Sequence, residues 1–180
     1  MRDLLQQGAL DIAVLSGNAP APVHSLAVEP LFEDRLCLVG LAQDPLLQRQ
    51  EIGIRQLARL PLILTGMSSA GVRNEIEALA SRSRVQLDVT VEVASFGLAV
   101  QMIRLGMGYT IYVGAGVDQH PDLAAVPISG LWLNRSLAWA LERPMSRLGS
   151  EVLGLLREHL QQLVGSGGWR GARPLRKSAR

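Results

Sequence analysis

Residues 91–113 read VEVASFGLAVQMIRLGMGYTIYV, and this stretch predicts a strand, a helix and a second strand. Its first three residues favour a strand, Ser95 is of a type that caps helix N-termini, and Gly106 suits the left-handed conformation that ends a helix. Two strands that are joined by a helix run parallel. Ligands of such sheets bind at the carboxyl ends of the strands, so Ser95 and Phe96 are expected beside a small-molecule site.

The same order of elements is predicted at residues 62–82. Leu62–Thr65 has the pattern of a buried strand, and a helix over residues 71–82 follows the segment that holds Ser68 and Ser69. The N-terminus of a helix offers unpaired N–H groups and a partial positive charge, which favour a carboxylate or another anion. Two such helix starts are therefore expected at one edge of the sheet.

A third strand is predicted at residues 10–15, and it runs into Ser16 and Gly17. It follows the end of a helix at residues 2–7, which stops at Gly8. Near the other end of the chain, six apolar residues at helical spacing predict one stripe that faces a core: Leu148, Val152, Leu155, Leu156, Leu160 and Leu163.

Four segments together carry a resemblance to a known family. They are LLQQGALDIAVL at residues 4–15, EPLFEDRLCLV at 29–39, LPLIL at 60–64 and RLGMGYT at 104–110. In this order they resemble the effector-binding domain of LysR-type transcriptional regulators. Each segment alone is common in α/β proteins, whereas the four in order are specific.

The resemblance implies an α/β fold of two Rossmann-like lobes with mixed sheets, periplasmic-binding-protein type II-like, in which two crossing strands join the lobes. Residues 1–50 and 131–164 would form the first lobe, and residues 51–130 would form the second. Residues 165–180 are rich in glycine and arginine, so they are expected to form a disordered basic tail.

The first lobe is expected to be incomplete. Members of the family carry a winged helix-turn-helix, a linker helix and the first strand, helix and second strand of the effector domain before the point that corresponds to Met1. No capping residue precedes Arg2, so the sequence is expected to be a fragment, an engineered piece or a gene whose start is placed late. Four apolar side chains should then lose neighbours: Ile12, Val14, Leu36 and Leu38.

The resemblance also implies which residues line the effector pocket. They follow predicted strands or lie on the helix after residue 95, and they are Ser16, Gly17, Thr65, Gly66, Ser68, Ser69, Ser95, Phe96 and Gln101. No Arg or Lys falls within these motifs, so an anion is expected to rely on backbone N–H groups and hydroxyls. Other roles stay open, because the serines could serve as helix caps only, Phe96 could pack between lobes, and Gln101 could be solvated or interlobe.

The charge of the chain argues against a nucleic-acid-binding surface. The formal net charge is +2, but five of the 18 basic residues lie in residues 165–180, which hold no acidic residue. Residues 1–164 therefore carry 13 basic and 16 acidic residues, a net charge of −3. A DNA-binding face would show clustered bases on a helix. Promoter DNA is thus expected as a partner only through the missing N-terminal domain.

Catalytic and metal-binding motifs are not evident in the sequence, so neither an enzyme nor a cofactor or metal is expected. The three histidines, His24, His120 and His159, have no ligand spacing with each other or with Cys37. Glu33 and Asp34 have no basic or hydroxyl partner nearby in sequence, and a solvated turn is the expectation for them. Gly106 and Gly108 lack the third glycine of a dinucleotide site.

The location of the protein is expected to be cytoplasmic, without membrane contact. No apolar run reaches the length that crosses a bilayer, and the N-terminus lacks the pattern of a signal peptide. Cys37 is the single cysteine, and its strand pattern indicates a buried structural thiol.

The expected function is that of the ligand-sensing, co-inducer-binding domain of a LysR-type regulator. The expected partner is a small anionic or polar metabolite, and the intact family assembles as homo-oligomers. Two alternatives stay open, namely a free solute-binding protein of the periplasmic type and a remnant that binds no ligand.

Overall fold

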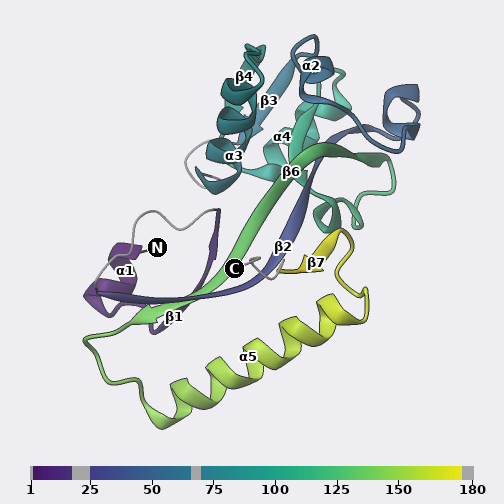
Figure 1. The fold of residues 1–180 in the computed structure, drawn as a ribbon. Coiled ribbons are helices and arrows are strands. Elements are labelled where there is room, and N and C mark those ends of the chain that lie inside the picture. Colours follow the sequence, from purple (N-terminus) through teal and green to yellow (C-terminus); the bar gives the residue numbers. More distant parts are fainter. Residues whose placement is uncertain (1, 18–24, 66–69, 176–180) are drawn as a thin grey trace. The chain divides into compact units, whose positions relative to one another are not determined.

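The computed structural model describes residues 2–17, 25–65 and 70–175 (Figure 1). Its elements in chain order are α1 (Arg2–Gln7), β1 (Ile12–Ser16), β2 (Leu26–Leu41), η1 (Pro45–Gln48), α2 (Ile54–Leu57), β3 (Leu62–Thr65), α3 (Ala70–Arg82), β4 (Val89–Val93), α4 (Phe96–Arg104), β5 (Thr110–Val113), η3 (Gly114–Val117), β6 (Leu123–Ala140), α5 (Arg147–Gly165) and β7 (Ala172–Pro174). Strands and helices alternate through the middle of the chain, as the sequence predicts.

The described residues form two sheets, whose strands pair in different directions. The larger has strand order β1-β6-β2-β5, with β7 paired to β2, and the pairs β1–β6, β2–β5 and β2–β7 are antiparallel. The smaller is the parallel pair β3–β4, and a parallel bridge joins Leu62 to Tyr109 just before β5. The predicted parallel strands at 91–113 are therefore not adjacent, because β3 lies between them.

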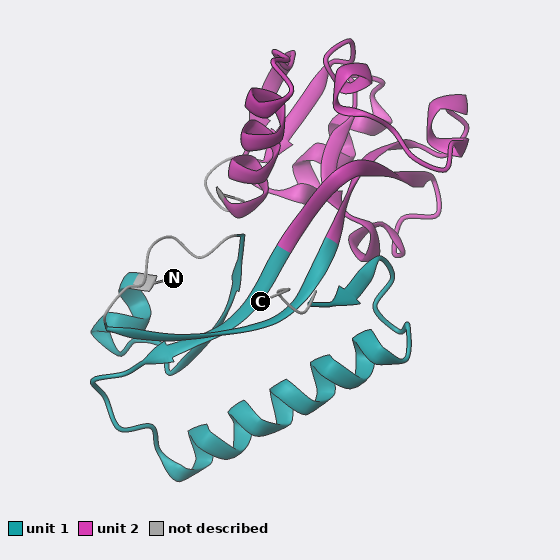
Figure 2. Ribbon diagram, in the orientation of Figure 1, with its two compact units in different colours: residues 1–34, 134–180 teal, residues 35–133 magenta. Residues whose placement is uncertain are grey.

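The chain divides into two compact units (Figure 2). Unit 1 comprises residues 1–34 and 134–180, and unit 2 comprises residues 35–133. Both boundaries fall inside the long strands β2 and β6. The family resemblance implies a first lobe of residues 1–50 and 131–164, whereas the first of the two units ends at residue 34 and resumes at residue 134.

In unit 2, helices cover both faces of β3, all of whose residues are buried. Leu64 belongs to a cluster with Ile76 of α3, whereas Ile63 belongs to a cluster with Val100 and Ile103 of α4. Because successive strand residues point to opposite faces, the two helices lie on opposite sides of the strand. Cys37 is buried in this unit, which confirms the predicted structural thiol.

In unit 1, two apolar clusters share the strands β1 and β6. Leu137 packs in a cluster with Leu153 of α5, and the next residue, Ala138, packs in a cluster with Leu5 of α1. Alternation along β6 thus gives each helix its own face of the strand. Val14 on β1 is 40% exposed.

The expectation that four apolar side chains lose neighbours is wrong for two of them. Leu36 and Leu38 are fully buried in the core of unit 2. The sequence assigns these residues to the first lobe, but they lie on the part of β2 that belongs to unit 2, where α3 and β5 supply neighbours.

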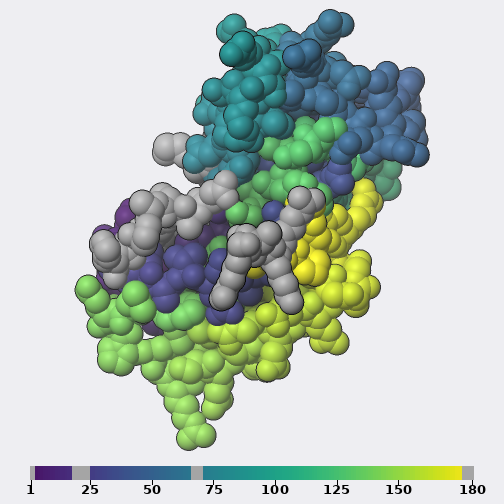
Figure 3. Space-filling model, viewed as in Figure 1, coloured from purple at the N-terminus to yellow at the C-terminus, as the bar shows by residue number. Residues whose placement is uncertain are grey.

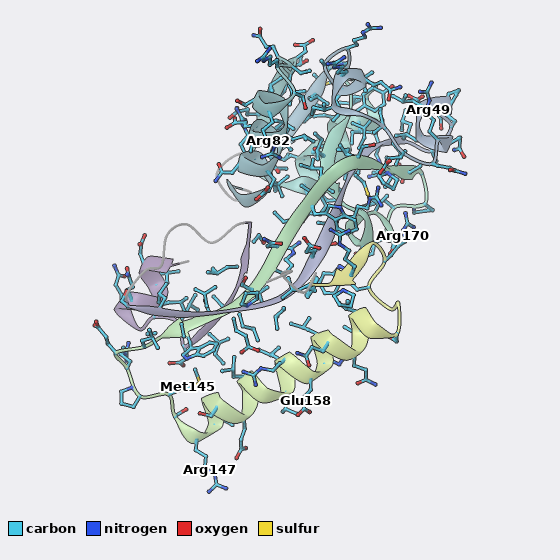
Figure 4. All side chains as sticks on the ribbon, viewed as in Figure 1. Arg49, Arg82, Met145, Arg147, Glu158 and Arg170 are labelled. Atoms are coloured by element: carbon cyan, nitrogen blue, oxygen red, sulfur yellow. The ribbon has the colours of Figure 1, made fainter. Side chains whose placement is uncertain are left out.

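The apolar stripe predicted on α5 is wrong in part. Leu148 and Leu155 are 71% and 67% exposed, while Leu153 and Val164, which the stripe omits, are buried. The core-facing side of the helix is therefore rotated from the predicted one. Sticks for Arg147 and Glu158 point away from the strands of unit 1 (Figure 4), and α5 forms a continuous band along the surface of that unit (Figure 3).

The prediction that residues 165–180 are disordered is wrong for residues 165–175. Trp169 packs against Phe32 with ring centroids 5.2 Å apart, and β7 pairs with β2. The Trp169 ring packs this glycine-rich segment against unit 1. The prediction of disorder rests on the average composition of the segment, which gives little weight to one aromatic residue. Residues 176–180 lie outside the described residues.

Candidate functional site

The start of α4 has the geometry that the sequence predicts. Ser95 has extended backbone angles, φ −149° and ψ 159°, and its hydroxyl accepts a hydrogen bond from Leu98 N–H at 3.4 Å. A capping role is thereby confirmed for Ser95, while a contact with effector stays a prediction. The helix starts directly after β4, so its first N–H groups lie at the carboxyl end of a parallel strand.

Phe96 has aromatic neighbours inside unit 2. Its ring stacks on that of Tyr112, with centroids 4.0 Å apart and an angle of 14° between the planes, and His120 lies 5.9 Å away in a tilted arrangement. Phe96 is half-buried. The sequence leaves two roles open for Phe96, and the stack adds a third, in which the ring helps to fix the first turn of α4 on unit 2.

The remaining predicted site residues of unit 2 differ in burial. Thr65, the last residue of β3, is 4% exposed, whereas Gln101 in the middle of α4 is exposed. Gly66, Ser68 and Ser69 lie outside the described residues.

One ion pair and one hydrogen bond connect charged or polar side chains near these elements in unit 2. Arg104 Nε and Nη2 donate to the Asp122 carboxylate at 2.7 and 2.9 Å, and this pairing lowers the pKa of Asp122 to about 2. The Tyr109 hydroxyl donates to the Asp44 carboxylate. Burial first and this hydrogen bond second raise the pKa of Tyr109 to about 12, so the phenol is neutral at ordinary pH.

In unit 1, Gly17 has a conformation that its residue type explains. Its φ is +94°, in the region that favours glycine, and its N–H donates to the Asn134 carbonyl at 2.9 Å. This turn ends β1 and leaves Ser16 exposed as the last strand residue.

Ser16 pairs in register with Arg135 of β6, and the Arg135 Nη1 donates to the Ser16 hydroxyl oxygen. The same guanidinium donates from Nε and Nη2 to Asp34 Oδ2 at 3.3 and 3.1 Å. Asp34 is fully buried and the Arg135 side chain is 18% exposed. A buried carboxylate of this kind requires such a partner.

This cluster corrects one expectation. The expected solvated turn at Glu33 and Asp34 is wrong, because both lie in β2, Asp34 pairs with Arg135, and Glu33 accepts from Arg173 Nε at 2.6 Å. The cluster also has a cation, Arg135, beside the predicted site residue Ser16, although no Arg or Lys falls within the sequence motifs of the predicted site residues. Sequence reasoning missed Arg135 because it lies 119 positions from Ser16; a charged residue within the apolar pattern of residues 131–139 is the one signal that could have found it.

The described residues contain no group of three or more His, Cys, Asp or Glu side chains that could hold a metal ion. In the same ranges, none of the helices is both long enough and apolar enough to cross a membrane. The polar groups identified above can donate hydrogen bonds to a ligand, and together with the α/β architecture they are typical of proteins that bind small solutes.

The chain matches the family described as "LysR substrate binding domain" over residues 1–161, and it belongs to that family. It is thus the effector-binding domain of a LysR-type transcriptional regulator. The HTH-type transcriptional regulator BbuR of Bordetella bronchiseptica is 30% identical over 171 residues, which cover 91% of this chain and 51% of that protein. The HTH-type transcriptional activator CmpR of Synechocystis is 26% identical over 102 residues, or 57% of this chain and 33% of that protein. The chain spans about half the length of BbuR and less of CmpR.

Solved structures share the fold at low sequence identity. The effector-binding domain of QuiR in complex with shikimate has a TM-score of 0.77 at 16% identity, with 89% of this chain and 77% of that chain covered. The regulatory domain of Synechocystis CcmR in complex with 2-PG has a TM-score of 0.74 at 20% identity, with 90% and 77% covered. These likenesses confirm the predicted periplasmic-binding-protein type II-like class.

Proposed function

We propose that this chain binds a small anionic or polar metabolite and acts as the ligand sensor of a LysR-type regulator, without catalysis. The observation that carries the proposal is the start of α4, where Ser95 caps a helix directly after a parallel strand. Such a helix start suits a carboxylate or a hydroxyl. In unit 2 we propose that this helix start and Thr65 are effector-binding groups, and in unit 1 we propose this role for Ser16 and Gly17.

In the whole regulator, we propose that effector binding changes transcription through a winged helix-turn-helix on a homo-oligomer in the cytoplasm. A ligand shifts such an equilibrium only if it binds one arrangement of the assembly better than another. Promoter DNA would be contacted through the helix-turn-helix and not through this domain. The similarity to BbuR and CmpR, which are HTH-type transcriptional regulators, favours this role over that of a free solute-binding protein.

Thermal-shift screening tests the proposal. The panel contains amino acids, organic acids, aromatic acids, shikimate and 2-PG. At a concentration of 100 times Kd, a ligand that binds only the folded chain stabilises it by about 2.7 kcal/mol, so a hit raises the melting temperature measurably. A panel without any hit would favour a remnant that binds no ligand.

A double variant, Thr65→Val with Ser95→Gly, tests the assigned residues. Valine keeps the shape of Thr65, and glycine at the N-cap position of α4 costs the helix little stability. The loss of the two hydroxyls should therefore weaken ligand binding more than it lowers the melting temperature of the free protein. Ser146→Gly is the matched control, because Ser146 caps α5 through Gly149 N–H at 3.0 Å and is not a predicted site residue. If the double variant binds a hit as tightly as the parent does, the assigned residues are wrong.

A further inference from the structure

We propose that Arg135 and Ser16 recognise a carboxylate of the effector, so that this domain selects small carboxylic acids over their neutral analogues. The inference rests on the proposed function and names the substrate class of the same site. The inference is based on the hydrogen-bonded cluster of Ser16, Asp34 and Arg135, all of which belong to unit 1.

The guanidinium of Arg135 is held in one orientation and still has donors to spare. A guanidinium carries five N–H groups. Within the described residues, Arg135 uses three of them, two toward Asp34 Oδ2 and one toward the Ser16 hydroxyl. Two N–H groups are left for an acceptor, and the 18% exposure of the side chain leaves an edge that a ligand can reach.

The hydroxyl of Ser16 is set to donate. Its oxygen accepts the hydrogen bond from Arg135 Nη1, so its own hydrogen is directed elsewhere. Ser16 is exposed at the end of β1, and Gly17 turns the backbone away directly after it. A ligand group beside Ser16 therefore meets an O–H donor next to a cation, which matches an acceptor such as a carboxylate oxygen.

The unused N–H donors of Arg135, rather than a net charge of the cluster, favour a carboxylate. Asp34 neutralises Arg135, and as a fully buried carboxylate it cannot give up this partner without a large cost. A carboxylate, with one charge shared by two oxygens, matches the remaining N–H groups and the Ser16 hydroxyl. An ion pair with a structural role only would explain Asp34 and Arg135, but it would give no preference among ligands.

The test compares carboxylic acids with their neutral analogues by isothermal titration calorimetry on the full chain. The probes are shikimate with methyl shikimate, benzoate with benzamide, and every acid found by the thermal-shift panel with its amide. The parent should bind at least one acid about tenfold more tightly than its neutral analogue, since a charge-assisted hydrogen bond is roughly twice as strong as one between neutral groups. Arg135→Gln should abolish this preference by weakening the binding of the acid more than that of its neutral analogue, and Ser16→Ala should reduce the preference.

Arg157→Gln is the matched control. Arg157 pairs with Glu29 in the same unit through two bonds of 2.7 Å, so its loss also removes an ion pair. The acid preference of this control should equal that of the parent. If Arg135→Gln fails to fold because the buried Asp34 loses its ion pair with Arg135, the double variant Arg135→Gln with Asp34→Asn removes both charges and should bind without acid preference.

The outcomes separate the two proposals. If acids bind and Arg135→Gln, or the double variant, keeps the preference of the control, the assignment of Arg135 is overturned while the proposed function stands. The same holds if the parent binds neutral analogues as tightly as acids. If no member of either panel binds, the proposed function fails and this inference fails with it.

Discussion

The ion pairs among the described residues of the two units differ in how far apart along the chain their partners lie, apart from the local pair Arg147–Glu151 in unit 1. In unit 2, the ion pairs join residues 4 to 19 positions apart, as in Arg104 with Asp122. In unit 1, three ion pairs join residues 101, 128 and 140 positions apart: Arg135 with Asp34, Arg157 with Glu29, and Arg173 with Glu33. Unit 1 is therefore completed only when β6, α5 and β7 return to β2.

This difference separates what motif reading can and cannot find. In unit 2, β3 and the helices that cover it are close together in the sequence. Local sequence patterns therefore predict this part of the core. In unit 1, the chemistry arises from partners that no local pattern connects. From this difference we expect substitutions in the core around β3 to lower the free energy of unfolding of unit 2 most. For unit 1, we expect an effect from substitutions at contacts made by the last elements of the chain.

The largest effect is expected for Ile63→Ala in the centre of β3. Ile63 is fully buried against α4, so its truncation should lower the free energy of unfolding by about 2–5 kcal/mol. Urea denaturation followed by circular dichroism measures this. Leu155→Ala, at a position that is 67% exposed, should change the free energy by less than about 0.5 kcal/mol. Equal effects of the two variants would contradict the assigned core.

A smaller effect is expected for Trp169→Ala, in the segment that the sequence predicts to be disordered. Loss of its contact with Phe32 should lower the free energy of unfolding by about 1–3 kcal/mol, because the side chain packs in the core of unit 1. Leu148→Ala, on the exposed side of α5, is the control. A melting temperature unchanged by Trp169→Ala would mean that the segment does not pack on unit 1.

Much of the fold could be predicted from the sequence, because its elements carry local signals. Ser95 as a cap and Gly106 as a terminator bound α4, and the alternation of apolar residues bounds β1 and β3. The face of α5 could not be predicted, since a leucine-rich helix offers more than one apolar side and only its neighbours decide which is buried.

The candidate site could be predicted only in outline. The order of strands places Ser16 and Ser95 at the ends of β1 and β4, where the structure has them. Arg135 and Asp34 were missed, because an ion pair across 101 positions depends on strand pairing and not on spacing. Local sequence predicts the strand in which a side chain lies, but its interaction partner depends on the tertiary structure.

The smallest effect is expected from the short-range pair Arg104–Asp122. Pairing lowers the pKa of Asp122 from 3.8 to about 2, so its stabilising contribution is present above pH 4 and is lost as the pH falls toward 2. Melting curves of the parent and of Asp122→Asn from pH 2 to pH 6 should differ slightly at pH 6 and converge at pH 2. A difference that grows as the pH falls would contradict the pairing.

The most direct test of the central claim maps bound effector onto the chain. Backbone amide chemical shifts are recorded by NMR while the strongest hit of the thermal-shift panel is added. The largest changes are expected on Thr65 and Leu98 in unit 2, at the end of β3 and in the first turn of α4, and on Gly17 in unit 1, after β1. Changes confined to α5, or none at saturating ligand, would contradict the claim.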